Sequence, residues 1–412
     1  MKIRSITFFT SANADGKFSN LAQINKAAML GKQGFNLAGF EVQTTRLATQ
    51  SFAQYFPDNV KNAVKLAQKM EKDAAREGFS YLSIGPAFPS YDWAFPLIPL
   101  LLAGTQNIFC TAVIANLTEG ISLPAIKACG KIIAQNTPIT PDGFTNLRFA
   151  ALANVSAHAP FFPAAYHDNE APGFSLAIEC ADVAFKAVND AKSTQECSQA
   201  FQSALESAVN TLDPICLEIT KKTGLEFLGF DFSPAPFPVD TCSLGGAMEA
   251  IGTKLGKYGA VASAALLASV LEKGKWKKVG FNGMMMPVLE DSILARRTED
   301  LSFGIKDLLL YSTMCGTGLD TVPLPGDATA EQLSAVLLDV AAIAIRLNKP
   351  LTARLMPIPG KKAGDITSFD FEYFANGRVM NLEAQPLTGV FSGDETFMIL
   401  PRQFGKEIIS PV

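Results

Sequence analysis

Short apolar stretches with strand character alternate with helical patterns along almost the whole chain. The strand candidates are residues 3–9, 37–45, 80–84, 107–115, 147–154, 174–179, 226–232, 279–285, 318–322, 351–358 and 368–374. The helix candidates are residues 19–33, 58–77, 121–135, 181–192, 195–222, 244–273, 287–313 and 329–347. Continuous apolar stretches are typical of strands buried on both faces, and intervening helices provide the crossovers of parallel pairing. We therefore predict an α/β fold of mostly parallel strands with surrounding helices, either a closed barrel or an open sheet.

The chain shows no sign of division into separate domains. Its 412 residues would suffice for one large α/β domain or for two ordinary ones. No linker rich in serine, glycine or proline separates the elements, so we predict a single domain over residues 1–412. Only 18% of the residues are charged, which indicates extensive burial and makes a homo-oligomer the expected state.

Charge and hydropathy exclude several classes of partner. The net charge of −4 and the isoelectric point near 5.5 give no reason to expect nucleic acid or an anionic membrane surface as partner. The most apolar stretch, residues 94–104, is too short to span a bilayer and contains prolines. The apolar run at the N-terminus is too short for a signal peptide, so we expect a cytoplasmic protein.

Polar and charged residues gather where predicted strands end in glycine or proline. In α/β folds such strand ends deliver side chains to one face, where binding sites form. Five segments are the most informative, and most of them show this arrangement: 231–238 (DFSPAPFP), 243–252 (SLGGAMEAIG), 281–291 (FNGMMMPVLED), 315–327 (CGTGLDTVPLPGD) and 354–365 (RLMPIPGKKAGD). We predict that these segments surround a common interior hollow.

The seven cysteines are scattered and never form a C-x-x-C pair, so neither a disulfide framework nor a thiolate zinc site is indicated. Cys315 is the most interesting thiol, because it follows a helical stretch and precedes Gly-Thr-Gly. Backbone N–H groups in such a turn can lower the pKa of a thiol. The alternative is that Cys315 only fills a tight corner between helix and strand.

Cations in the segment 354–365 suit the recognition of a carboxylate or phosphate. Lys361 lies in a tight loop with Asp365, and Arg354 lies on the strand before it. The spacing of a Walker A loop is missing. The alternative is a solvated hairpin whose lysines face water.

Carboxylates near predicted strand ends are candidates for proton transfer or for oxygen ligation of a Mg²⁺-type ion. Glu290 and Asp291 either act as a general base or metal ligand, or stabilise the start of the next helix. Asp231, Asp320 and Asp327 offer further oxygens. Their spacing does not establish a metal site, and we assign no metal ligand.

Only two histidines, His158 and His167, are present, so we expect no multi-histidine metal site. Asp168 and Glu170 flank His167, which a carboxylate could therefore orient for proton transfer. Otherwise His167 is a hydrogen-bonded loop residue. No cofactor motif is present, and the cofactor is unknown.

Several motifs together resemble the DUF711 family, which is related to the UPF0210 group of uncharacterised proteins. The matching stretches are FFPAAYH (161–167), GFDFSPAP (229–236), GFNGMMMPVLED (280–291), the block 315–327, PIPGKKAGD (357–365), the opening strand and VQTTR (42–46). The resemblance implies a ten-stranded α/β barrel like that of pyruvate formate-lyase and ribonucleotide reductase, but no established activity. The glycyl-radical segment of that fold has Asn381 where glycine is required, and the adjacent cysteine pair is missing, so we expect no radical chemistry.

Three functions remain open from the sequence. The first is a non-radical enzyme that acts on a small anionic metabolite in the barrel mouth. The second is a catalytically silent protein that binds a metabolite or serves as a scaffold. The third is a metal-assisted hydrolase or lyase, which requires three convergent ligands among Asp231, Glu290, Asp291, Asp320, Asp327 and His167.

For the enzyme, two sets of residues are assigned. The groups that would carry the reaction are Cys315, His167, Glu290 and Asp291. The groups that would contact the anion are Arg46, Arg354, Lys361, Asp231, Asp320 and Asp365. Convergence of Cys315, His167 and a carboxylate in one cavity would favour the enzyme, and wide dispersal would favour the binding protein.

Overall fold

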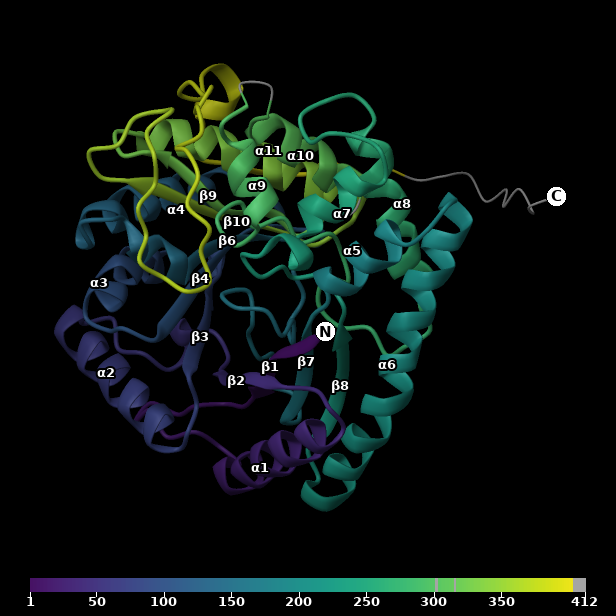
Figure 1. The fold of residues 1–412 in the computed structure, drawn as a ribbon. Helices are drawn as coiled ribbons and strands as arrows, with labels where there is room; N and C mark the ends of the chain where they lie inside the picture. The colour runs from purple at the N-terminus through teal and green to yellow at the C-terminus, as the bar shows by residue number, and fades with distance from the viewer. Residues whose placement is uncertain (301–302, 315, 403–412) are drawn as a thin grey trace.

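The computed structural model of the protein describes residues 1–300, 303–314 and 316–402 (Figure 1). Eleven strands in these ranges belong to one sheet: β1 (Lys2–Phe9), β2 (Val42–Ala48), β3 (Tyr81–Ala87), β4 (Ile108–Asn116), β5 (Gly120–Ser122), β6 (Phe149–Ala153), β7 (Gly173–Glu179), β8 (Glu226–Asp231), β9 (Gly318–Pro325), β10 (Leu351–Ile358) and β11 (Thr396–Phe397). The helices are α1 (Leu21–Leu37), α2 (Val60–Arg76), α3 (Ile98–Ala103), α4 (Leu123–Asn136), α5 (Ala181–Asn189), α6 (Thr194–Thr223), α7 (Leu244–Ala250), α8 (Ala260–Lys273), α9 (Ser292–Arg297), α10 (Ile305–Met314) and α11 (Ala330–Leu347). None of the helices described is long and apolar enough to cross a membrane.

The main path of the sheet runs β8-β7-β1-β2-β3-β4-β6-β10-β9. The five strands from β1 to β6 along this path pair in parallel. The pairs β7–β8 and β9–β10 are also parallel within themselves. Each pair joins the five-stranded part through one antiparallel contact, β1 with β7 and β6 with β10. The predicted α/β class with a mostly parallel sheet is therefore confirmed.

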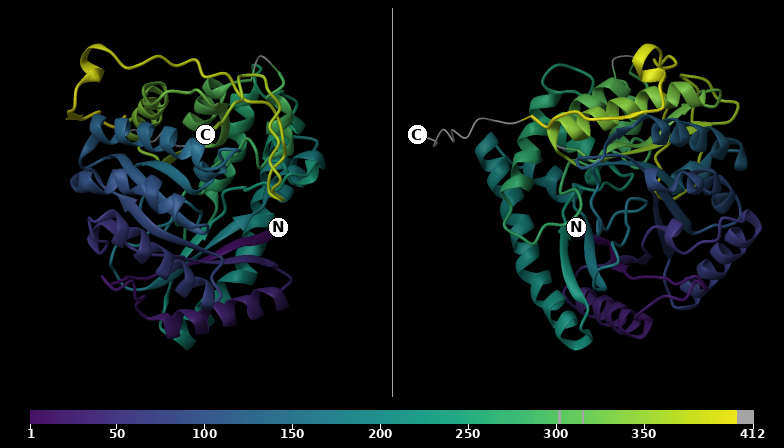
Figure 2. Two further views of the ribbon diagram at one scale, coloured as in Figure 1. Left: turned by 90° about the vertical axis from the view of Figure 1, so that its left-hand side faces the viewer. Right: turned by 180° about the vertical axis from the view of Figure 1, so that it is seen from behind.

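Helices cover the outside of the curved sheet, and loops occupy its interior (Figures 1 and 2). The strands are accordingly buried on both faces, and every residue of β7 and β10 is buried. Helix α2 turns Ala63, Ala67 and Met70 inward at helical spacing. This double burial explains why the strand sequences are continuously apolar instead of alternating.

The sheet does not close through a continuous ladder in the described ranges. The segment 278–287 runs between its two edges, where Lys278 forms an isolated bridge with Phe230 of β8 and Pro287 forms one with Asp320 of β9. The sheet thus has eleven strands instead of the expected ten, and in the described ranges single bridges to the segment 278–287 connect its two edges. Closure into the expected barrel is not confirmed.

Two strand predictions were wrong. Residues 279–285 form no strand, because Gly280 and Asn282 adopt positive φ angles of 75° and 42° and turn the chain. Residues 368–374 alternate aromatic side chains as a strand would, but those rings pack among themselves and against Phe144 instead of joining the sheet. Both segments enter the interior.

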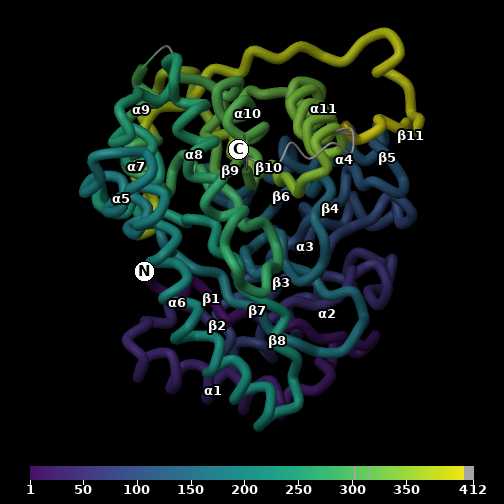
Figure 3. Tube along the Cα trace, turned by 90° about the vertical axis from the view of Figure 1, so that its right-hand side faces the viewer, coloured from purple at the N-terminus to yellow at the C-terminus, as the bar shows by residue number. Residues whose placement is uncertain are grey.

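Two predicted helices are each divided into two shorter helices in the structure. The stretch 244–273 divides into α7 and α8 where Gly252, Gly256 and Gly259 have positive φ angles. The stretch 287–313 holds α9 and α10 instead of one helix. Helix α7 contacts both α5 and α9, and these three helices form one corner of the molecule (Figure 3).

Asp231 at the end of β8 anchors the interior segment that follows Gly280. Its buried carboxylate accepts hydrogen bonds from the N–H groups of Phe281 at 2.7 Å, Asn282 at 2.9 Å and Ser233 at 3.0 Å, and from the Ser233 hydroxyl at 2.6 Å. Gly280 must be glycine here, because a Cβ would lie 2.3 Å from the Asp231 Oδ2 atom. Asp231 therefore holds a turn instead of facing a ligand.

Replacing Asp231 tests this anchoring role. We expect Asp231→Ala to lower the free energy of unfolding by roughly 3 to 5 kcal/mol, because it leaves buried N–H groups without an acceptor. Chemical denaturation measures this loss. In the matched control Asp365→Ala, which removes an exposed carboxylate that accepts from the Lys362 N–H, the loss should stay below about 1 kcal/mol. Equal losses in the two variants would contradict the role of Asp231.

Candidate functional site

A cavity of about 90 Å³ lies among strands from both halves of the sheet. Its strand residues come from β1, β2, β3, β4, β6, β9 and β10: Arg4, Gln43, Thr44, Arg46, Tyr81, Phe109, Ala150, Asp320, Thr352 and Arg354. The other lining residues come from segments between the strands: Leu147, Phe161, Phe162, Pro163, Ala164, Ala235, Phe281, Met285, Glu290, Thr317, Phe371 and Tyr373. Strands near both ends of the path thus face one cavity, so the sheet curves around it.

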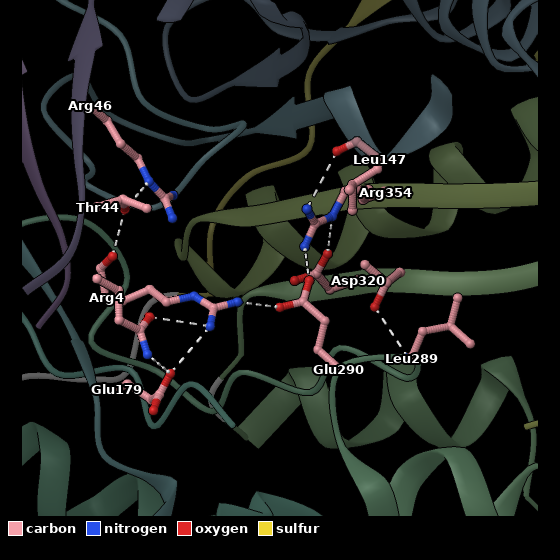
Figure 4. Close-up of polar contacts among 11 residues, drawn as sticks. Arg4, Thr44, Arg46, Leu147, Glu179, Leu289, Glu290, Asp320 and Arg354 are labelled. Atoms are coloured by element: carbon pink, nitrogen blue, oxygen red, sulfur yellow. Dashed lines mark hydrogen bonds and ion pairs between the residues drawn. The ribbon is translucent and has the colours of Figure 1, made fainter. Parts of the chain in front are cut away.

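A chain of ion pairs extends along one side of this cavity (Figure 4). Arg4 of β1 contacts Glu179 of β7 at 3.2 Å and Glu290 at 2.9 Å. Arg354 of β10 contacts Glu290 at 2.8 Å and Asp320 of β9 at 2.5 Å. Glu290 therefore bridges two arginines, and the chain joins the edge strand β9 to β7 across the interior.

Each charge in this chain is largely removed from water. The side chains of Arg354 and Glu290 are 9% and 13% exposed. Burial raises the pKa of Asp320, and the neighbouring Arg354 opposes that rise. A buried charge of this kind is stable only when it is paired. Removal of one residue of the chain therefore leaves its partner as an uncompensated charge with an unfavourable desolvation free energy.

Arg46 differs from the other two cavity arginines because it forms no ion pair with any carboxylate that the structure describes. Its Nε atom donates to the Thr44 hydroxyl at 2.9 Å. Its guanidinium lies 5.2 Å from the ring centre of Phe162 and 5.5 Å from that of Tyr81. Burial, and then the charge of Arg4, lower the pKa of Arg46 to about 10, which leaves it ionised at neutral pH. In Figure 4 it extends from β2 toward Arg4 and Arg354.

Aromatic rings form much of the remaining wall. Phe109 packs edge-on against both Tyr81 and Phe162, and Arg4 lies 4.6 Å from the ring centre of Tyr373. Rings over guanidinium groups hold those groups in place without neutralising them. The cavity thus combines a fixed cationic group with an apolar surface.

Four of the predicted site residues line this cavity: Glu290, Asp320, Arg46 and Arg354. Asp291 does not. Its buried carboxylate caps α9 by accepting from the N–H groups of Ile293 and Leu294, both at 3.0 Å, and it also accepts from the Gly245 N–H. Asp291 therefore stabilises the start of a helix, the structural alternative considered from the sequence. Its carboxylate also connects the start of α7 to the start of α9.

Lys361 and Asp365 lie elsewhere. They line a separate surface depression with Gly360, Gly364 and Arg378. Asp365 accepts from the Lys362 N–H at 2.7 Å, as expected for a solvated turn. The idea that all five segments face one hollow is therefore too broad: 243–252 contributes nothing to the cavity, and 354–365 contributes only Arg354.

The predicted imidazole does not lie in this cavity. Cys315 lies outside the described residues. The described cysteines are buried, and burial raises the pKa of several of them, as for Cys110 to about 12. His167 does not line the cavity and instead lies beside His158 and Asp168.

The carboxylates proposed as metal ligands do not converge. In the described part of the chain, one group of three ligating side chains has its donor atoms within 4.8 Å of one another: His158, His167 and Asp168. The expectation of no multi-histidine site rested on the number of histidines, but two imidazoles suffice when a carboxylate supplies the third donor.

The sequence reasoning missed Arg4, Glu179 and the two tyrosines of the cavity. The available signal was a charged residue inside a strand expected to be buried on both faces. Arg4 interrupts β1, and Glu179 ends the apolar strand β7, where it is 4% exposed. A buried charge requires a partner, so these positions indicated an interior ion pair.

Comparison with known proteins agrees with the motifs found along the chain. Residues 1–376 match the family described as "Uncharacterised ACR (DUF711)". The chain belongs to the DUF711 family. Two curated proteins from Pyrobaculum, both named UPF0210 protein, are similar to it. The one from Pyrobaculum aerophilum is 31% identical over 64% of this chain and 60% of the relative. The one from Pyrobaculum arsenaticum is 28% identical over 84% of this chain and 79% of the relative.

A UPF0210 protein of Clostridium perfringens is 28% identical over 76% of this chain and 72% of its own length. None of these names states an activity. Family membership therefore leaves the function to be argued from the cavity.

Glu290→Gln tests the bridging ion pairs. The substitution keeps the shape of the side chain but removes the charge shared by Arg4 and Arg354. We expect a loss of about 3 kcal/mol in the free energy of unfolding, because two buried cations lose their common partner. Urea denaturation measures the loss. Glu218→Gln, which breaks a solvent-exposed pair with Lys222, is the control and should leave stability unchanged within error.

Proposed function

We propose that this protein binds a small carboxylate-bearing metabolite in the interior cavity, with Arg46 as the group that recognises the anion. The observation that carries the proposal is the unpaired guanidinium of Arg46 on the cavity wall. An arginine presents five N–H donors, and the one hydrogen bond that Arg46 forms within the described residues uses Nε. The Nη1 and Nη2 groups therefore suit a planar, two-pronged carboxylate.

The dimensions of the cavity favour a small ligand. A volume of about 90 Å³ accommodates a molecule of few non-hydrogen atoms. The rings of Phe109, Phe162 and Phe281 offer contact to an apolar portion beside the charged end. We infer that the curved sheet works as a barrel around this ligand, as the likeness to the pyruvate formate-lyase fold implied.

The charges around the cavity suggest that ligand binding takes up a proton. Arg4, Arg46 and Arg354 balance Glu179, Glu290 and Asp320 before any ligand arrives. A bound monoanion would add one uncompensated negative charge in a poorly solvated space. Asp320 is the group best suited to accept a proton, because burial already raises its pKa.

Geometry favours binding over the enzyme with the assigned catalytic set. His167 does not line the cavity that holds Glu290 and Asp320, so the described residues bring no imidazole to the carboxylates of the cavity. The enzyme remains the second candidate on one observation: Asp320, a buried carboxyl with a raised pKa, lines the cavity and could exchange a proton with a ligand.

Substitution of Arg46 separates recognition from folding. We expect Arg46→Leu to reduce the affinity for carboxylate probes such as acetate and pyruvate at least tenfold, while stability stays within about 1 kcal/mol, because an unpaired buried charge is removed. Calorimetric titration and thermal melting measure the two effects. Lys361→Ala, at the separate surface depression, should bind as the unaltered protein does. Unchanged affinity in Arg46→Leu, or tighter binding of inorganic phosphate than of carboxylates, would contradict the proposal.

The pH dependence of binding tests the proton uptake. If one proton enters with each anion, the dissociation constant should rise up to about tenfold per pH unit above the pKa of the free site. Calorimetry in buffers of different ionisation enthalpy counts the protons directly. Asp320→Asn should abolish the uptake, whereas a pH-independent affinity in the unaltered protein would remove this part of the proposal.

A further inference from the structure

The two histidines of the chain, His158 and His167, lie side by side, and neither of them lines the cavity. The Nε2 atom of His158 lies 3.2 Å from the Nδ1 atom of His167. The Oδ1 atom of Asp168 lies 3.2 Å from the first nitrogen and 3.7 Å from the second. Three donor atoms of the kind that transition metals prefer thus face one another.

The triangle of these atoms has the size that a metal ion requires. Its three sides give a circumradius of about 2.0 Å, so points close to its plane lie within roughly 2.0 to 2.2 Å of all three atoms, the bond length of zinc to nitrogen and oxygen. Tetrahedral bonds of that length separate neighbouring ligands by roughly 3.3 to 3.5 Å. The observed separations bracket this range, and no side chain would have to move far.

The fold fixes the positions of these ligands through the loop between β6 and β7. The His158 N–H donates to the Tyr166 carbonyl at 2.9 Å, which brings the two ends of the segment 158–167 together. The His167 N–H donates to the Thr49 carbonyl at 3.0 Å, beside the end of β2. His158 adopts a φ angle of 71°, a conformation that non-glycine residues rarely accept without compensation.

The protonation state also suits ligation. Burial lowers the pKa of His158, and it lowers the pKa of His167 to about 4, with a further contribution from His158. Both imidazoles are therefore neutral near pH 7, and a metal ion binds the neutral ring. Asp168, whose side chain is 38% exposed, leaves one side of the triangle accessible from solvent.

We propose that His158, His167 and Asp168 bind one divalent transition-metal ion of the zinc type. Three protein ligands leave further coordination positions for water or another small donor. None of the three residues lines the anion cavity, but residues 161–164 between the histidines do. The ion therefore joins both ends of a segment whose middle forms part of the cavity wall, and the metal site is independent of the proposed anion.

Zinc titration of the full chain after dialysis against a chelator tests the site. We expect one Zn²⁺ per chain by calorimetry, and a Co²⁺ visible spectrum that shows nitrogen and oxygen ligation. Asp168→Asn and His158→Gln should each weaken Zn²⁺ binding at least tenfold, because each removes one of three ligands. Glu170→Gln changes an exposed carboxylate in the same loop outside the triangle and should bind Zn²⁺ as the unaltered protein does.

Folding and ligation can be told apart, because Asp168 is partly exposed and its asparagine variant should keep the far-ultraviolet circular dichroism of the unaltered protein. Zn²⁺ should also raise the melting temperature of the unaltered protein and of Glu170→Gln, but not that of Asp168→Asn. The proposal is overturned if the chelator-treated protein takes up no Zn²⁺, or if Asp168→Asn and His158→Gln bind it with unchanged affinity. In either case the three side chains form only a hydrogen-bonded cluster.

Discussion

The interior of this protein depends on the paired charges that cross it. Arg4, Glu290 and Arg354 connect β1, the turn before α9 and β10, and Glu179 and Asp320 extend the chain to β7 and β9. The neighbours β7 and β1 lie far from the neighbours β10 and β9 along the sheet. The ion pairs therefore connect the two ends of the sheet, which in the described ranges are otherwise linked by isolated bridges to the segment 278–287. Because a buried charge without a partner is destabilising, the position of each charged residue in this chain of ion pairs restricts the positions of its neighbours.

Arg46 acquires its distinct character from that network. Glu290 already pairs with both Arg4 and Arg354, and Asp320 pairs with Arg354. Aromatic rings fix the Arg46 guanidinium without neutralising it. The same low-dielectric surroundings that make this charge expensive also make it selective for an anion. Around it, the anchoring by Asp231 and the capping by Asp291 position the segments that complete the wall.

Much of the architecture was predictable from local sequence patterns. The continuous apolar strands and the intervening helices indicated an α/β fold, and β10 was predicted with the observed bounds. The errors have local causes. Asn282 adopts a positive φ angle in a stretch that looked like a strand, and glycines at 252, 256 and 259 interrupt what looked like one helix. The aromatic alternation of 368–374 reflects packing among rings instead of pairing in the sheet.

By itself, the sequence determined the class of fold, the family and the segments that hold most of the polar groups, because these follow from periodicity and from local turn chemistry. Only the tertiary structure decided which polar groups meet. Arg354 and Lys361 are seven residues apart, yet one enters the cavity and the other faces a surface depression. His158 and His167 are separated by an apolar segment, yet a backbone hydrogen bond closes the loop and brings their rings together. Contacts between residues distant in the chain depend on how strands and loops curve in space, and no single sequence pattern encodes that curvature.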